Sequence, residues 1–253
     1  MRIIVTGGAG FIGSNLILRL HEKYPDWEIF NIDKLTYASD QSYLKPLKDS
    51  GRYYFKKVDL VNREEVHDVV QMFKPQGVFH LAAESHVDNS IKGPEPFIQS
   101  NVVGTFNILE ECRQLWKDDD KAWKNNRFVH VSTDEVYGEL EDDGYFTEQT
   151  PYAPSSPYSA SKAGSDMIVR SYFRTFGMNV VVPNCSNNYG PHQHDEKLIP
   201  TVIRNAIGHN EIPVYGKGDN VRDWLFVHEH NDALDVAFHK GKAGETYNIG
   251  GNN

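Results

Sequence analysis

A tyrosine and a lysine four residues apart are the first pair in this sequence that could do chemistry together. Tyr158 and Lys162 follow the second proline of the segment APSSP, where a helix is expected to begin. Side chains at positions i and i+4 lie on the same face of a helix, so the phenol and the ammonium are expected to be neighbours. A nearby positive charge favours the phenolate and lowers the pKa of a tyrosine. The spacing therefore predicts a tyrosine that acts as a general base.

Two hydroxyl and two carboxyl side chains stand in a row before this pair. Ser132 and Thr133 end a buried-strand pattern, and Asp134 and Glu135 follow directly. In open parallel sheets, ligands bind at the carboxyl ends of the strands, so the two hydroxyls are expected to bind the oxygen on which Tyr158 acts. Taken alone, the Asp-Glu pair is more typical of a solvated loop, and that alternative stays open.

A glycine-rich segment at the start of the chain has the spacing of a phosphate-binding turn. In TGGAGFIG, Thr6–Gly13, the glycines Gly7, Gly10 and Gly13 lie between an expected strand and an expected helix. Glycine permits the tight turn and the close approach of a diphosphate, while the helix N-terminus favours negative charge. Strand, turn and helix together predict a dinucleotide site.

Acidic and polar residues follow each of the next expected strands. Asp33 ends the second strand, twenty residues after Gly13, where a carboxylate binds the ribose hydroxyls of adenosine. It would repel a 2′-phosphate, so NAD is expected rather than NADP, although Lys34 leaves NADP open. Asp59 is expected near the adenine, and His80–Ser85 near the nicotinamide.

The elements that must position these residues alternate along the chain. The expected strands are apolar and β-branched: Arg2–Thr6, Glu28–Ile32, Tyr53–Val58, Gly77–Leu81, Arg127–Ser132 and Asn179–Asn184. The expected helices between them are Phe11–Lys23, Arg63–Phe73, Phe97–Leu115 and Tyr158–Thr175. Because parallel strands need crossovers, the fold class is α/β, with a Rossmann-type doubly wound parallel sheet.

The regular alternation is expected to break down after Asn184. We therefore expect a NAD-binding domain over residues 1–184 and a small C-terminal substrate-binding region over 185–253 that is partly interleaved with the sheet. The formal net charge of −9 argues against nucleic acid as a partner. No run of apolar residues is long enough for a membrane span, and Met1 leads into a strand without a signal-peptide profile. Two distant cysteines indicate a reducing compartment, so the cytoplasm is expected.

Four segments resemble the extended short-chain dehydrogenase/reductase family: TGGAGFIG, HLAAESHVD, STDEVYG and YSASK. Within it, the triplet Thr133-Asp134-Glu135 and three longer segments resemble the dTDP-glucose 4,6-dehydratases. Those segments are CSNNYGP at Cys185–Pro191, EKLIP at Glu196–Pro200 and VYGKGDNVRDWL at Val214–Leu225.

The resemblance implies an NAD-dependent lyase that removes water from the sugar of dTDP-glucose and forms dTDP-4-keto-6-deoxyglucose. Oxidising the 4-hydroxyl to a ketone makes the hydrogen at position 5 acidic. Tyr158 would take the 4-hydroxyl proton, Glu135 the proton at position 5, and Asp134 would protonate the departing 6-hydroxyl. The pKa values of the two carboxyl groups must then be separated, with Asp134 protonated and Glu135 ionised.

The resemblance also completes the expected residue sets. The catalytic residues are Thr133, Asp134, Glu135, Tyr158 and Lys162. The cofactor-binding residues are Gly7, Gly10, Phe11, Ile12, Gly13, Asp33, Lys34, Leu35, Thr36, Asp59, Leu60, Leu81, Ala82, Ala83, Ser85, Ser100, Ser132, Tyr158, Lys162 and Asn188. The substrate-binding residues are Ser85, Thr133, Asn187, Lys197, Leu198, Pro213, Tyr215 and Arg222. Glu84 is expected near the nicotinamide or the sugar. His192 and His194 are expected to be loop residues near the substrate entrance, and no metal is expected.

Two other functions stay open. One is another nucleotide-sugar enzyme of this family, a 4-epimerase or a UDP-glucuronate decarboxylase, which needs no acid and base at positions 134 and 135. The other is an NAD-binding form without turnover. The family usually continues beyond TYNIGG, so we expect an incomplete nucleotide pocket and uncertain activity in this 253-residue chain. The apolar faces of Phe97–Leu115 and Tyr158–Thr175 are expected to form a homodimer through a four-helix bundle.

Overall fold

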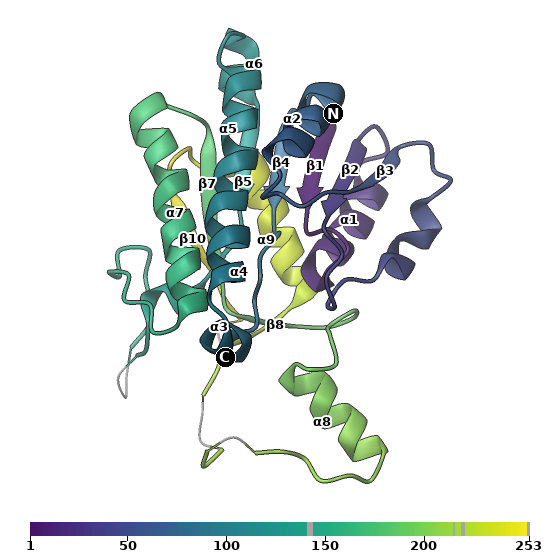
Figure 1. Ribbon diagram of the computed structural model, residues 1–253, viewed down its shortest axis with the longest axis vertical. Helices are drawn as coiled ribbons and strands as arrows, with labels where there is room; N and C mark the ends of the chain where they lie inside the picture. Colours follow the sequence, from purple (N-terminus) through teal and green to yellow (C-terminus); the bar gives the residue numbers. More distant parts are fainter. Residues whose placement is uncertain (141–143, 215, 219–220, 252–253) are drawn as a thin grey trace.

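A parallel β-sheet forms the centre of the molecule (Figure 1). A computed structural model of the chain describes residues 1–140, 144–214, 216–218 and 221–251. The sheet runs in the order β10-β7-β5-β4-β1-β2-β3, with β6 paired to β7. Its strands are β1 (Arg2–Thr6), β2 (Glu28–Asp33), β3 (Tyr53–Lys57), β4 (Gly77–His80), β5 (Arg127–His130), β6 (Ser132–Thr133), β7 (Val180–Cys185) and β10 (Thr246–Ile249). A separate parallel pair joins β8 (Asn187–Tyr189) to β9 (Trp224–Phe226).

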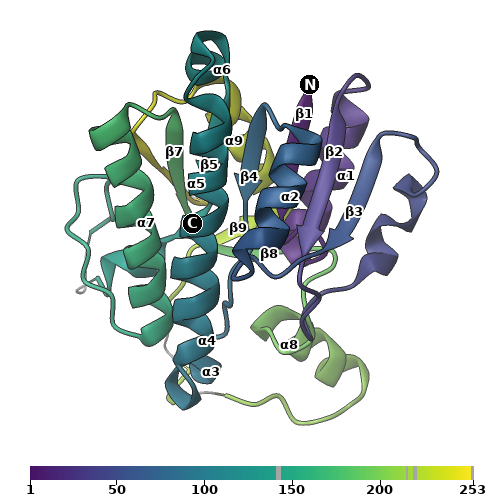
Figure 2. The ribbon, with the colours of Figure 1, turned by 45° about the horizontal axis from the view of Figure 1, so that its top comes forward.

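Helices cover both faces of the sheet (Figure 2). The longer helices are α1 (Phe11–Lys23), α2 (Arg63–Phe73), α5 (Gly104–Trp116), α7 (Pro157–Phe176), α8 (Leu198–Ile207) and α9 (Val227–Lys240). The shorter ones are η1 (Gln41–Leu47), α3 (Val87–Lys92), α4 (Glu95–Phe97), η2 (Ile98–Val103), α6 (Asp120–Asn125) and η3 (Asp134–Tyr137). One core cluster includes side chains of α2, α5 and α7, and the other includes side chains of α1 and α9. Strands covered on both faces carry continuous apolar runs, which is why β1 reads RIIVT.

The doubly wound parallel sheet is confirmed, and its elements begin close to where the sequence indicates. All six expected strands are present, although the segment Arg127–Ser132 is divided into β5 and β6. Helix α7 begins with Pro157 in its first turn, and Ser156 and Ser159 form a capping box around that end.

One expected helix has a different local structure. The segment Phe97–Leu115 contains the end of α4, the π-helical turn η2 and then α5. Single π-helical turns are often found at functional sites. Here the turn places Ser100 and Asn101 in buried positions, and Ser100 lines the cavity described below.

The alternation of strand and helix continues beyond Asn184, against expectation. Strand β9 leads into α9, which packs beside α1, and β10 then pairs with β7. Helix α9 has no side-chain cap and β10 has four residues, so neither carries a strong local signal. By contrast, α8 has no buried residue and lies apart from the sheet in both views (Figure 1, Figure 2).

No helix among the described residues is both long and apolar enough to span a membrane.

Candidate functional site

The glycine-rich turn forms a cradle at the start of α1. Gly7 has φ +70°, and a Cβ atom there would lie 2.8 Å from the backbone nitrogen of Ala82. A Cβ atom on Gly13 would lie 2.3 Å from the carbonyl oxygen of Gly7. Gly10 caps the helix without a side-chain hydrogen bond, so this end of α1 is left for a ligand. The turn therefore fits a diphosphate against the helix N-terminus.

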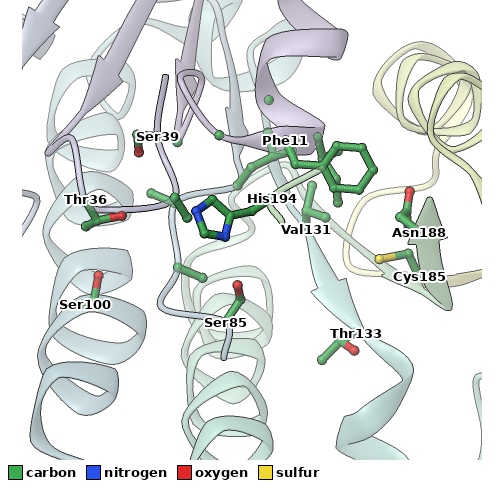
Figure 3. A pocket seen from close by; sticks show the side chains of 18 of the residues that line it. Phe11, Thr36, Ser39, Ser85, Ser100, Val131, Thr133, Cys185, Asn188 and His194 are labelled. Carbon is green, nitrogen blue, oxygen red and sulfur yellow. The ribbon is translucent and has the colours of Figure 1, made fainter. Parts of the chain in front are cut away.

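A cavity of about 470 Å³ joins this cradle to the carboxyl ends of the central strands (Figure 3). Its size and its mixed apolar and polar lining are typical of a site for a cofactor or another small molecule. Most of the expected site residues line it: Gly7, Gly10, Phe11, Ile12, Gly13, Asp33, Lys34, Thr36, Asp59, Leu60, Leu81, Ala82, Ala83, Ser85, Ser100, Ser132, Thr133, Glu135, Tyr158, Lys162, Asn187, Asn188, Lys197 and Leu198.

Four expected residues do not line the cavity: Leu35, Asp134, Pro213 and Arg222. Tyr215 lies outside the described residues. Leu35 takes part through its backbone, because its amide donates a hydrogen bond to Asp33. Arg222 acts at longer range, because its charge lowers the pKa of both Asp134 and Glu135.

The Asp33 carboxylate is held in one orientation by the protein. Oδ1 accepts hydrogen bonds from the amide of Leu35 at 2.8 Å and the hydroxyl of Ser39 at 3.1 Å. Oδ2 accepts one from the amide of Ala9 at 3.0 Å. Charge-assisted bonds of this kind fix both oxygens at the end of β2, facing the cavity.

Lys34 forms an ion pair that the sequence did not indicate. Its ammonium lies 2.6 Å from Oε1 of Glu84 and donates to the hydroxyl of Ser100 at 3.4 Å. Glu84, expected near the nicotinamide or the sugar, is thus engaged with the residue that follows Asp33. The ion pair neutralises the charge of Lys34, the residue because of which NADP stayed open as the alternative cofactor.

Tyr158 and Lys162 are both buried on α7, one turn apart. The Lys162 ammonium donates to the carbonyl oxygen of Val131 at 2.8 Å. Burial raises the pKa of Tyr158 well above its usual value, the charge of Glu135 raises it further, and a hydrogen bond with Thr133 lowers it. The net shift is opposite to the expected lowering by Lys162, because the loss of solvation and the neighbouring carboxylate dominate.

Asp134 and Glu135 lie in η3, directly after β6. Burial raises the pKa of Asp134, which also accepts a hydrogen bond from Thr133 at 3.2 Å. Burial and the charge of Asp134 raise the pKa of Glu135, while Lys197 and Arg222 lower it. The two pKa values shift in the same direction, so the expected separation is not visible in this arrangement. The two carboxyl groups differ in the cations that act on them. Arg222 lowers the pKa of both, and Lys197 also lowers the pKa of Glu135.

Several residues that line the cavity were missed: Ile32, Ala38, Ser39, Val58, Val131, Cys185, Ser186, Gln193, Glu196 and Trp224. Cys185, Ser186 and Glu196 lie within segments that carried the resemblance, which is the signal that could have found them. Three buried polar atoms in this wall have no hydrogen-bond partner: Ser186 Oγ, Asn188 Oδ1 and Gln193 Oε1. Such atoms favour a polar ligand in the cavity.

Of the two loop histidines, His194 lines the cavity and His192 does not. His192 stacks on Tyr43 with ring centroids 3.9 Å apart, and its Nδ1 lies 3.0 Å from the Ser14 hydroxyl. The His194 ring projects into the cavity between Thr36 and Ser85 (Figure 3). Within the described part of the chain, no cluster of three or more potential ligands could hold a metal ion.

Comparison with known proteins places this geometry among nucleotide-sugar enzymes. Residues 4–253 match the family described as GDP-mannose 4,6 dehydratase. A dTDP-glucose 4,6-dehydratase of Salmonella typhimurium is 51% identical over 263 residues, covering 100% of this chain and 73% of that protein. The crystal structure of a Bacillus anthracis dTDP-glucose 4,6-dehydratase in complex with NAD superposes with a TM-score of 0.90 at 46% identity, covering 100% of this chain and 76% of that one. A UDP-glucose 4-epimerase of Thermotoga maritima superposes with a TM-score of 0.88 at 27% identity, covering 99% of this chain and 77% of the epimerase chain.

Proposed function

The chain belongs to the GDP-mannose 4,6 dehydratase family, and from this premise we propose that it converts dTDP-glucose to dTDP-4-keto-6-deoxyglucose and water with NAD as cofactor. The observation that carries the proposal is the single cavity that joins a diphosphate cradle to Tyr158 and Glu135. The identity of 51% to a dehydratase, against 27% to an epimerase, supports the same assignment.

The residues at the strand ends fit NAD. Gly10 and Gly13 line the cavity at the start of α1, where the diphosphate would bind, and Asp33 presents a fixed carboxylate for the adenosine ribose. Lys162 and the unpartnered Asn188 amide oxygen would hold the nicotinamide half. Bound NAD supplies a hydride acceptor for carbon 4 of the sugar and, once reduced, a hydride donor for carbon 6.

The protein side chains would move the protons. Tyr158 takes the proton of the 4-hydroxyl, with Thr133 bound to the same oxygen. The ketone at carbon 4 then makes the hydrogen at carbon 5 acidic, and Glu135 removes it from within the cavity. Asp134, whose pKa is raised by burial, gives its proton to the departing 6-hydroxyl. Lys162 stabilises the phenolate of Tyr158 during the first step.

The nucleotide half of the substrate would bind near α8. Lys197 and Leu198 line the cavity on that side, together with Asn187. Arg222 suits a diphosphate because its planar group can bind two oxygens. Pro213 and Tyr215 complete the proposed set, although Tyr215 lies outside the described residues. The product of this reaction is a precursor for deoxysugars.

The proposed reaction is tested by incubating the purified chain with NAD and dTDP-glucose. We expect a product lighter by one water, the alkaline absorbance of a 4-keto sugar and no net accumulation of NADH. Release of a 4-epimer without loss of water would favour the epimerase instead. Binding of NAD with no change in the sugar nucleotide would indicate a form without turnover.

Glu135→Gln tests the role of the carboxylate within this reaction. Loss of one general base is expected to lower kcat about 10²- to 10⁴-fold, while NAD still binds. Exchange of the hydrogen at carbon 5 with solvent deuterium should fall in parallel. Glu139→Gln, an exposed glutamate, is the matched control. An unchanged exchange rate in Glu135→Gln would remove this residue from the mechanism.

A homodimer would cover apolar surface on two neighbouring helical segments. Ile98 and Phe106 on one, and Met167 and Phe173 on the other, are exposed. We infer that two copies pair these faces as a four-helix bundle. Met167→Glu should shift the molar mass in light scattering from two chains to one, whereas Met72→Glu on α2 should not.

Cys112 and Cys185 are both free and buried, which supports the cytoplasm as the compartment.

A further inference from the structure

A buried carboxyl group lies behind the proposed catalytic residues. Asp166 stands on α7, one turn after Lys162, and has no exposed surface. Its Oδ2 accepts hydrogen bonds from the hydroxyls of Ser132 at 2.7 Å and Tyr152 at 2.9 Å. Its Oδ1 lies 3.0 Å from Nε2 of His130. Burial of a carboxyl group is costly unless hydrogen bonds compensate for it, and these three contacts supply that compensation.

The contact with Ser132 decides how that hydroxyl acts in the cavity. A serine hydroxyl has a single proton, and here the proton is donated to Asp166. Ser132 lines the cavity, and because its proton is donated to Asp166, its hydroxyl oxygen offers only lone pairs to a ligand. The Ser132 oxygen can accept a hydrogen bond from the sugar hydroxyl on which Tyr158 acts. It has no proton left to donate to Tyr158 in place of the sugar hydroxyl.

The charge of Asp166 also acts on Lys162. Burial lowers the pKa of the Lys162 ammonium, and the charge of Asp166 raises it. The other groups that face this ammonium are neutral near pH 7. Burial lowers the pKa of His80 well below its usual value and that of His130 to about 4, and it raises the pKa of the Cys185 thiol to about 12. Asp166 is thus the charged group that opposes the loss of the Lys162 proton.

We propose that Asp166 is a positioning residue of the reaction, which turns the Ser132 oxygen towards the substrate as an acceptor and keeps Lys162 charged beside Tyr158. This inference rests on the proposed function. One carboxylate thereby acts on residues of two different elements, by a hydrogen bond with Ser132 on β6 and by its charge on Lys162 of α7.

Asp166→Asn tests both effects, because asparagine has nearly the same volume but no charge. In the full chain with NAD, kcat for dTDP-glucose is expected to fall about 10- to 100-fold with little change in KM, since one to two hydrogen bonds to a charged group are lost. The alkaline limb of the kcat profile should move to lower pH, because Lys162 loses its proton more easily. Tyr152→Phe is the matched control. It removes one hydrogen bond from the same oxygen, keeps the charge and the Ser132 contact, and should leave kcat within about twofold.

A double-mutant cycle separates positioning from a merely structural role. If Asp166 acts through Ser132, Asp166→Asn should cost much less in a Ser132→Ala background than alone. Equal costs in the two backgrounds, with an unmoved alkaline limb, would overturn the proposal, as would an unchanged kcat. Should Asp166→Asn not fold, Asp166→Glu gives the same decision. It keeps the charge but displaces the carboxyl oxygens, so kcat should fall while the alkaline limb stays in place.

A readout without turnover keeps this inference distinct from the proposed reaction. The pKa of Lys162 can be followed by carbon NMR of its methylene group next to the amine, in the chain with NAD bound. It should be lower in Asp166→Asn than in the wild type, and an equal value would count against Asp166. Failure of the wild-type chain to form product from dTDP-glucose would count against the proposed function and leave this comparison intact.

Discussion

At the scale of single residues, the site depends on how polar groups are paired once they are buried. Asp33 and Tyr158 were chosen from their positions in the sequence, and both line the cavity. The pKa of Tyr158, however, follows from burial and from Glu135 rather than from the lysine on its own helix. A phenol with a raised pKa needs added positive charge to lose its proton, and we expect the oxidised nicotinamide ring and Lys162 to provide it together.

Glu84→Gln is predicted to change the preference between the two nicotinamide cofactors. The substitution frees Lys34 for a 2′-phosphate, so the ratio of the Kd for NADP to the Kd for NAD should fall by about two- to fivefold, the worth of a partly exposed ion pair. Titration calorimetry with both cofactors measures it, and Glu22→Gln on the exposed face of α1 is the control. If the ratio stays the same, the ion pair has no part in this preference.

At the scale of elements, two segments far apart in the sequence meet at the mouth of the cavity. Tyr37 precedes η1 and Tyr43 lies within it, while the segment before α8 carries His192 and Glu196. Tyr43 stacks on His192, and the Tyr37 hydroxyl donates to Glu196 at 3.1 Å. The reaction returns its hydride, so NAD need not leave between turnovers, and a closed mouth is compatible with that cycle.

Tyr43→Ala is therefore predicted to speed the release of NAD. Loss of one stacked aromatic pair should raise the dissociation rate about two- to tenfold. The rate can be measured by diluting the NAD complex into a competing cofactor analogue. Tyr145→Ala, at a far more exposed tyrosine, should leave it unchanged. Equal dissociation rates in the wild type and Tyr43→Ala would show that the stacked pair does not restrain the cofactor.

At the scale of the whole molecule, buried histidines couple stability to pH. Burial lowers the pKa of His130 to about 4 and that of His230 to about 3, and neither nitrogen of His230 has a hydrogen-bond partner. Between pH 6.5 and 4 these side chains bind a proton in the unfolded chain but not in the folded one. The free energy of unfolding therefore decreases as the pH falls through this range.

His230→Leu should make the protein less sensitive to acid. Removing one such histidine is expected to recover about 3 kcal/mol of the loss between pH 6.5 and pH 4, and an apolar side chain suits the buried position. Urea unfolding at several pH values measures it. His194→Leu, at the cavity mouth, should retain the wild-type slope against pH. A His230→Leu slope equal to that of the wild type would contradict the assignment.

The parallel sheet, the glycine-rich cradle and the tyrosine-lysine pair on one helix could be predicted from the amino-acid sequence. These follow from local rules: apolar runs form buried strands, glycine is required where backbone approaches backbone, and residues four apart share a helix face. The resemblance added Asn187, Asn188 and Lys197, which all line the cavity.

The side chains that meet across different elements could be identified only in the folded molecule. The Lys34–Glu84 ion pair joins the segments that follow β2 and β4, and Asp166 on α7 accepts a hydrogen bond from Ser132 on β6. Strand β10 pairs with β7, which lies much earlier in the chain. Such contacts depend on how strands are ordered in the sheet and on which faces helices bury. No periodicity or short motif encodes them, because the residues concerned are far apart in sequence and become neighbours only when the sheet forms.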